Sequence, residues 1–264
     1  MSSLPQHGRV NCTACYGVAQ VAFDRTKHTE GNWRITANPL AWGNPEAEIV
    51  VLGFSKGPTQ AGAIERTPHE EIAFKGSRLN VAKILAHVGL LGKEGDTALK
   101  SAVDKAISNK TGRFHFGSLI RCTVERYDTN TAEWKGTGGA MLDKFVATDF
   151  GRKVSRQCIS LFLGNFPPQT KLVIMFGLGS KQNYVREAYA LFQKVRPGKW
   201  GWINDVSYTD GRITVVHVEH FASRGALIPN WLGKNNHDRS FLGNMARSSV
   251  EQTLRKKINR GTRH

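Results

Sequence analysis

Four cysteines are the residues whose type and spacing most directly suggest chemistry. Cys12 and Cys15 form a Cys-x-x-Cys pair, and Cys122 and Cys158 follow at long intervals. In a reducing compartment, such a pair with two remote cysteines and none left over is more typical of metal ligation than of disulfides. The alternative is a short pair plus two unrelated core cysteines, because unpaired cysteine is often buried. The cysteines therefore predict a cofactor site and leave a packing role open.

Two histidines and a glutamate form a second candidate group. His217, Glu219 and His220 follow a β-branched run, at the point where a strand is expected to give way to a loop. Functional groups of open α/β sheets gather at the carboxyl ends of the strands. These residues are therefore expected at a functional site, although His217 and Glu219 can also be flanking residues or partners that orient the second histidine.

Four apolar segments are predicted to be the strands that position these groups. They lie at residues 48–53, 114–120, 171–177 and 212–218. Near-continuous apolar runs of this length are typical of parallel strands covered on both faces, and the second segment is the weakest match.

Helical periodicity occurs between and after these strands. It covers residues 79–88, 184–192 and 242–254. We therefore predict an α/β fold, a three-layer αβα sandwich with a four-stranded mainly parallel central sheet, formed by residues 1–264 as a single domain.

Residues 123–149 and 199–203 do not follow this alternation, and the second stretch is expected to be a turn plus short structure. Residues 123–149 have no sustained period, so we expect a long loop, which in a compact domain is usually functional or mobile. The basic end, Arg255-Lys-Lys and residues 260–263, is either a solvated helix face or a tail that contacts phosphates.

The charge of the chain indicates a polyanionic partner. Lys and Arg total 37 against 21 Asp and Glu, a formal charge of +16 at pH 7. A field of this sign attracts nucleic acid, and six Trp and 13 Phe are interleaved with the basic residues. The alternative is a basic protein without such a ligand.

Membrane and secretory classes are not indicated. The apolar runs are far shorter than the ~20 residues of a membrane helix, and residues 1–7 lack the charged and apolar regions of a secretory signal. We expect a cytoplasmic, nucleoid-associated protein, a monomer with no membrane partner.

The order of the motifs resembles that of the uracil-DNA glycosylase superfamily, most closely its iron–sulfur branches, over roughly residues 10–230. The matching segments, in chain order, are NCTAC, GNPEAEIVVLGFSKG, AFKGSRLNVAKILAHVGL, SLIRC, QCISLFL, KLVIMFGLGS and HFA. Each match is weak alone, but seven in the family's order make a specific pattern.

The resemblance implies roles in base recognition and catalysis. His220 stands where the family has the histidine that hydrogen-bonds the base oxygen as negative charge develops on it. Phe74 resembles the aromatic residue that stacks on the flipped base. In the turn after the first strand, Gly53 and Phe54 would contact the base, and Ser55 would occupy the catalytic position that orients water.

The resemblance also implies contacts with DNA and a cofactor. Lys56 and Ser223 would contact the DNA backbone, and Arg224 or Leu227 would fill the space that the flipped base leaves. The four cysteines would hold a 4Fe-4S cluster, which is structural in this family.

Two positions depart from the family pattern. No carboxylate lies between Gly53 and Gly57, so water would be activated by Glu65, Glu70 or Glu71, or by no residue if the bond breaks dissociatively. Ser118 occupies the base-binding position of the asparagine that reads the uracil edge, and a hydroxyl cannot make the two-point contact of an amide.

The sequence thus leads to a working hypothesis and two alternatives. The hypothesis is a monofunctional DNA glycosylase that excises uracil or a related deaminated base from single- or double-stranded DNA. The first alternative is a non-catalytic nucleic-acid-binding protein with the same fold and a structural metal cluster. The second is a zinc-stabilised DNA-binding module.

Overall fold

The computed structural model describes residues 4–136 and 141–255. Residues 137–140 of the expected loop and all but the first residue of the basic end lie outside the described residues.

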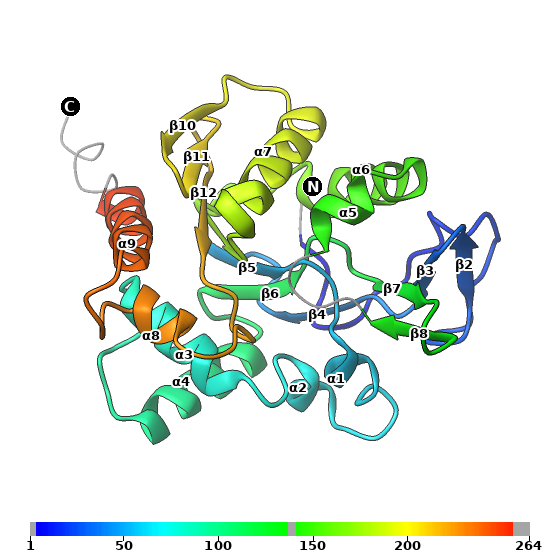
Figure 1. Ribbon diagram of the computed structural model, residues 1–264, viewed down its shortest axis with the longest axis horizontal. Coiled ribbons are helices and arrows are strands. Elements are labelled where there is room, and N and C mark those ends of the chain that lie inside the picture. The colour runs from blue at the N-terminus through cyan, green and yellow to red at the C-terminus, as the bar shows by residue number, and fades with distance from the viewer. Residues whose placement is uncertain (1–3, 137–140, 256–264) are drawn as a thin grey trace.

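An eight-stranded mixed sheet forms the centre of the structure, in the order β1-β4-β6-β5-β9-β12-β11-β10 (Figure 1). The four central strands are parallel: β6 (Phe114–Ser118), β5 (Ile49–Gly53), β9 (Leu172–Phe176) and β12 (Thr214–Val218). Antiparallel strands extend both edges: β4 (Leu40–Gly43) and β1 (Gly8–Arg9), then β11 (Ser207–Thr209) and β10 (Gly201–Asn204). Every residue of the central strands is buried, which explains why these segments are near-continuous apolar runs.

The predicted α/β class is confirmed, but the prediction of a four-stranded sheet is wrong. The four predicted segments all form strands, and they are neighbours. The edge strands were not predicted because they have only two to four residues. β4 is apolar throughout but too short to stand out as a run, and β1, β10 and β11 include polar side chains.

A second, antiparallel sheet corrects the expected long loop. It contains β2 (Lys27–Glu30), β3 (Trp33–Thr36), β7 (Thr123–Asp128) and β8 (Glu133–Gly136), in that order. β7, β8 and the short helix α5 (Leu142–Val146) therefore occupy most of residues 123–149. Arg34 and Glu125 face each other across β3 and β7 and form a two-point ion pair of 2.7 and 2.8 Å.

Helices lie on both sides of the large sheet (Figure 1). On one side are α3 (Arg78–His87), α4 (Asp96–Ser108), α8 (Leu227–Trp231) and α9 (Arg239–Arg255), and on the other are α5, α6 (Asp149–Leu163) and α7 (Asn183–Val195). The three predicted helices correspond to α3, α7 and α9. The short helices α1 (Pro58–Ala61) and α2 (His69–Ile72) follow β5, and the 3-10 helix η1 (Ser180–Gln182) precedes α7. No helix of the described ranges is long and apolar enough to cross a membrane.

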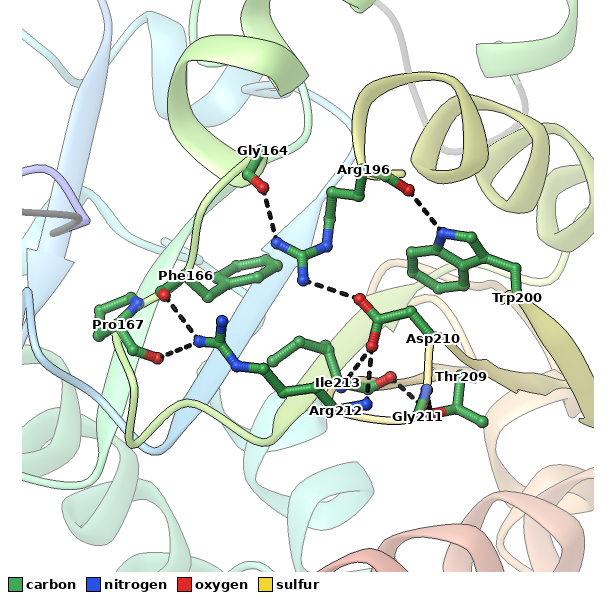
Figure 2. A network of polar contacts seen from close by, with 10 residues as sticks. All are labelled: Gly164, Phe166, Pro167, Arg196, Trp200, Thr209, Asp210, Gly211, Arg212 and Ile213. Carbon is green, nitrogen blue, oxygen red and sulfur yellow. Dashed lines mark hydrogen bonds and ion pairs between the residues drawn. The ribbon is translucent and has the colours of Figure 1, made fainter. Parts of the chain in front are cut away.

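A polar network fixes the amino ends of β9 and β12 (Figure 2). Arg196, just after α7, donates to the carbonyl of Gly164 and to the carboxylate of Asp210, each at 2.7 Å. Arg212 donates from the β11–β12 turn to the carbonyl of Phe166, also at 2.7 Å. The network joins the ends of α6 and α7 to the turn that precedes β12. It therefore fixes the amino ends of β9 and β12, and so helps to position the loops at their carboxyl ends.

Candidate active-site cleft and cysteine cavity

A cleft of about 620 Å³ opens at the carboxyl ends of β5, β9 and β12. Its walls come from the loops after these strands, the segment before α3, and the starts of α8 and α9. Eight of the ten residues predicted for catalysis, base binding or DNA binding line it: Gly53, Phe54, Ser55, Phe74, His220, Ser223, Arg224 and Leu227. Residues far apart in the sequence are thus brought to one site, as the parallel strands predict.

His220 is held as a neutral hydrogen-bond donor. The backbone N–H of Ala222 donates to His220 Nδ1 at 3.2 Å, so in the neutral ring Nε2 carries the proton. Burial lowers the pKa of His220 to about 4, although the neighbouring Glu219 acts in the opposite direction. The imidazole is therefore uncharged at neutral pH, with an Nε2–H that can donate to a ligand in the cleft.

Glu219 anchors the loop that carries His220. Its Oε1 accepts from the His220 backbone N–H at 2.9 Å and from Ser223 Oγ at 2.7 Å, and its Oε2 accepts from Arg239 Nε at 2.5 Å. Asn80 of α3 also donates to the Phe221 carbonyl at 2.9 Å. These contacts occupy the Glu219 carboxylate and fix the loop from two helices.

An aromatic wall stands beside His220. The Phe221 ring stacks on the imidazole at 4.4 Å, and Phe74 meets Phe221 edge-on at 5.0 Å. Phe74 also packs edge-on against Phe176, and its backbone φ is +52°. A non-glycine residue with this φ is uncommon and is held there by its surroundings. The cleft therefore has a rigid apolar face against which a planar ring can pack.

Glycines make room behind the opposite wall. Gly177 and Gly179, after β9, have φ of +121° and +74°. A Cβ on Gly179 would lie 2.0 Å from Oδ1 of Asn183, at the start of α7. Only glycine therefore allows this loop to pack so closely on α7 while it lines the cleft.

His217 lies in the core, away from the cleft. It is fully buried on β12, its Nδ1–H donates to the Gly177 carbonyl at 3.0 Å, and its Nε2 accepts from the Tyr208 hydroxyl at 3.1 Å. Burial lowers its pKa to about 4. The structure supports the packing interpretation of His217, because both ring nitrogens are used within the fold.

Lys56 and Ser118 are the two predicted residues that do not line the cleft. Ser118 is buried at the end of β6, beside Gly53 in the sheet. The Lys56 side chain is buried and donates to the carbonyl of Arg121. Because a phosphate contact requires a cation at the surface, the position of Lys56 contradicts its predicted role in DNA binding.

The suggested water-activating carboxylates are also elsewhere. Glu65, Glu70 and Glu71 are not among the residues that line the cleft, and Glu70 accepts a hydrogen bond from His7. Within the described part of the chain, Glu219 is the only carboxylate of the lining, and it already has three donors.

Sequence reasoning missed several residues of the cleft. Gln60 provides the only carboxamide in its described lining, and Lys75 adds a cation to the rim beside exposed Arg224. Leu227 is 39% exposed at the same rim. Phe221 could have been noticed as the neighbour of His220, whereas nothing in the local sequence marks Gln60 or Arg239.

The four cysteines line one small cavity. Cys12 and Cys15 belong to the N-terminal segment, Cys122 follows β6, and Cys158 lies on α6. Burial raises the pKa of Cys15 and of Cys158 to about 12. A metal must therefore displace protons to bind these thiols.

Hydrogen bonds bring the N-terminal cysteines to this place. Gln157, one residue before Cys158 on α6, donates to the Ala14 carbonyl at 3.0 Å. The His28 ring bonds the Cys15 carbonyl through Nδ1 at 2.6 Å. The cysteine pair is thus attached to α6 and to the second sheet.

The four cysteines line one cavity but are not grouped as a site for a single ion. In residues 4–136 and 141–255, no three His, Cys, Asp or Glu side chains are grouped so that they could hold one metal ion. Tetrahedral zinc requires four sulfurs about 3.8 Å apart, whereas each thiolate of a four-iron cluster binds a different iron and stands further from the others. One shared cavity without a single-ion site is therefore compatible with a 4Fe-4S cluster.

No protein-family model and no curated protein matches the chain. The functional argument therefore depends on the motifs and on the geometry of the cleft and the cysteine cavity.

Proposed function

We propose that the protein is a DNA glycosylase of the uracil type, which flips a base into the cleft and hydrolyses its N-glycosidic bond. The observation that carries this proposal is His220, a half-buried neutral imidazole in the cleft, protonated on Nε2 and stacked beside an aromatic wall. A fixed donor aimed at developing charge stabilises the transition state more than the ground state.

The chemistry follows from the groups present. The bond between the sugar C1′ and the base nitrogen breaks, and its electron pair leaves with the base, whose carbonyl oxygen gains negative charge. His220 Nε2–H stabilises that oxygen, and water adds to C1′ and loses a proton to solvent. Because the carboxylate of the described lining is already bonded, the proposed bond cleavage is dissociative and precedes attack by water.

Base and DNA contacts use the other cleft residues. Phe74 and Phe221 pack against the flipped base, and the Gln60 amide can both donate to and accept from its edge, which Ser118 is not placed to do. Lys75 and Arg224 at the rim contact phosphates, and exposed Leu227 fills the vacated space in the duplex. The charge of +16 supports this partner.

The proposed cofactor is a 4Fe-4S cluster held by Cys12, Cys15, Cys122 and Cys158. When bound, the cluster would cross-link the N-terminal segment, the loop after β6, and α6, and so would supply stability rather than chemistry at the cleft.

One observation favours a second candidate, a DNA-binding protein of the same fold without catalysis. The described lining holds no unpaired carboxylate to activate water, and Ser118 is outside the cleft. A flipped base would then be bound and released intact.

Excision of uracil separates the two candidates. The purified protein is incubated with end-labelled oligonucleotides that contain one uracil, either single-stranded or paired with guanine, and abasic sites are cleaved with alkali. We expect a labelled fragment of the length set by the uracil, and none from the matched thymine oligonucleotide. Tight binding of both oligonucleotides with no cleavage at enzyme excess would support the non-catalytic protein.

The rate of excision is expected to change little with pH between about 5.5 and 7.5. A histidine with the ordinary pKa of ~6.5 is only about 10% neutral at pH 5.5, whereas His220, with a pKa of about 4, stays neutral. Single-turnover rates at saturating enzyme measure this directly. A tenfold fall towards pH 5.5 would show that the imidazole titrates normally.

The same shift limits the usable pH range. Because His217 and His220 are harder to protonate in the folded chain than in the unfolded chain, the unfolded state binds more protons between pH 6.5 and about 4. Folding stability is therefore lost as the pH falls through this window. Circular dichroism at each pH confirms that the rates refer to folded protein.

A further inference from the structure

Two buried cations stand beside the cysteine cavity without carboxylate partners. Lys56 is 2% exposed and Arg121 is 1% exposed. None of the ion pairs formed by the described residues includes either of them. Since ionised groups are costly to bury alone, these two charges require a partner.

The Lys56 ammonium is bonded inside the fold, next to one of the cysteines in the sequence. It donates to the carbonyl of Arg121, the residue that precedes Cys122. Three acidic groups would stabilise its positive charge when they are ionised. Cys122 has the largest effect, Cys158 the next and the Asp24 carboxylate the smallest.

Arg121 is only partly satisfied by its neighbours. Its guanidinium donates to the Leu40 carbonyl and to Nε2 of His115, each at 3.3 Å, and lies over the Phe162 ring at 5.1 Å. His115 is buried and its pKa is well below the usual range, because of burial and then of Arg121, so it is a neutral acceptor. Arg121 Nε has no partner in the described structure, while its backbone N–H donates to Cys158 Sγ at 3.3 Å.

A bound cluster would supply the missing charge. A 4Fe-4S core of charge +2 bound by four thiolates has a net charge of about −2, which Lys56 and Arg121 together neutralise. We propose that Lys56 and Arg121 are the counter-ions of the cluster held by the four cysteines, and that they make the reduced cluster easier to form. This inference rests on the proposed cofactor.

A charge-removing substitution tests the counter-ion role through stability. Lys56→Met keeps the length of the side chain and removes its charge. In the iron-loaded protein we expect Lys56→Met to lower the urea midpoint of unfolding, because the cluster loses a counter-ion. In the iron-free protein it should leave the midpoint unchanged or raise it, because an unpaired buried charge is gone.

The reduction potential provides a second readout. Lys56→Met should favour the oxidised cluster by about tenfold or more, which corresponds to a fall in the reduction potential of about 59 mV for one electron. The potential is measured by film voltammetry or by an EPR titration. Lys56→Arg keeps the charge and should retain most of the potential. Lys93→Met, which removes an exposed lysine in the loop between α3 and α4, is the matched control and should shift the potential much less.

The outcomes separate this inference from the cofactor. If the wild-type protein, purified without oxygen, contains no iron or sulfide, the proposed cofactor is wrong and the counter-ion role fails with it. Two results with a cluster-containing wild-type protein would contradict the counter-ion role alone. In the first, Lys56→Met changes the urea midpoint of the loaded and the iron-free protein equally. In the second, Lys56→Met shifts the reduction potential no more than Lys93→Met does. Failure of Lys56→Met to fold even without iron would also contradict that role.

Discussion

Replacing His220 with alanine is expected to lower the single-turnover rate of uracil excision by about 100-fold or more, the usual effect of losing one donor to a developing anion. Affinity for DNA should stay nearly the same, because phosphate contacts dominate it. Rates are measured with enzyme in excess over a labelled uracil duplex, and binding is measured separately by fluorescence anisotropy.

His217→Ala is the matched control, since it removes the same ring three residues earlier. It leaves the Gly177 carbonyl and the Tyr208 hydroxyl without partners, and each loss costs about 1–3 kcal/mol of stability. We therefore expect lower stability but a much smaller loss of excision per folded molecule. Equal losses of excision in the two variants, or a change below about threefold in His220→Ala, would contradict the role assigned to His220.

Substitution of any one of the four cysteines by alanine is expected to remove most of the iron and the brown colour and to destabilise the chain. In the proposed cofactor site the four thiolates would anchor the cluster, and metal binding at such sites is coupled to folding. Cys158→Ala is the most informative variant, because this residue comes last in the sequence and lies inside α6. Iron and sulfide are determined chemically, and stability by urea unfolding.

Ser155→Ala provides the matched control for Cys158→Ala. Ser155 is fully buried one turn earlier on α6, and its hydroxyl has no hydrogen-bond partner in the described structure. Its removal should leave iron content unchanged. Colour and iron retained in Cys158→Ala would remove that residue from the ligand set, and a colourless wild-type protein with zinc would favour the zinc module.

The sequence predicted those parts of the fold whose signal is local. Three of the central strands could be found because burial on both faces favours uninterrupted apolar residues. α7 and α9 could be found because each buries one stripe, whereas α3 is buried around much of its surface. β7 and β8 were missed because they belong to a small sheet with exposed polar positions, so their alternation is incomplete. The place of β7 is set by pairing with β3, a contact across more than eighty residues, and β8 then pairs with β7.

The site was predicted to a similar extent. Loops at the carboxyl ends of parallel strands meet at one edge, so His220, Ser55 and Phe74 could be grouped before the structure was known. The direction in which a side chain points within a loop could not be predicted in this way. Lys56 follows Ser55 in the sequence, but Ser55 lines the cleft whereas the Lys56 side chain is buried and donates to the Arg121 carbonyl.

The left-handed backbone of Phe74 is strained, and the burial of its ring more than offsets the strain. A large side chain in this conformation costs about 1–2 kcal/mol relative to glycine, whereas truncation of a buried phenylalanine costs about 3–5 kcal/mol. Selection for thermal stability and selection for base binding would therefore both retain a large aromatic side chain at position 74.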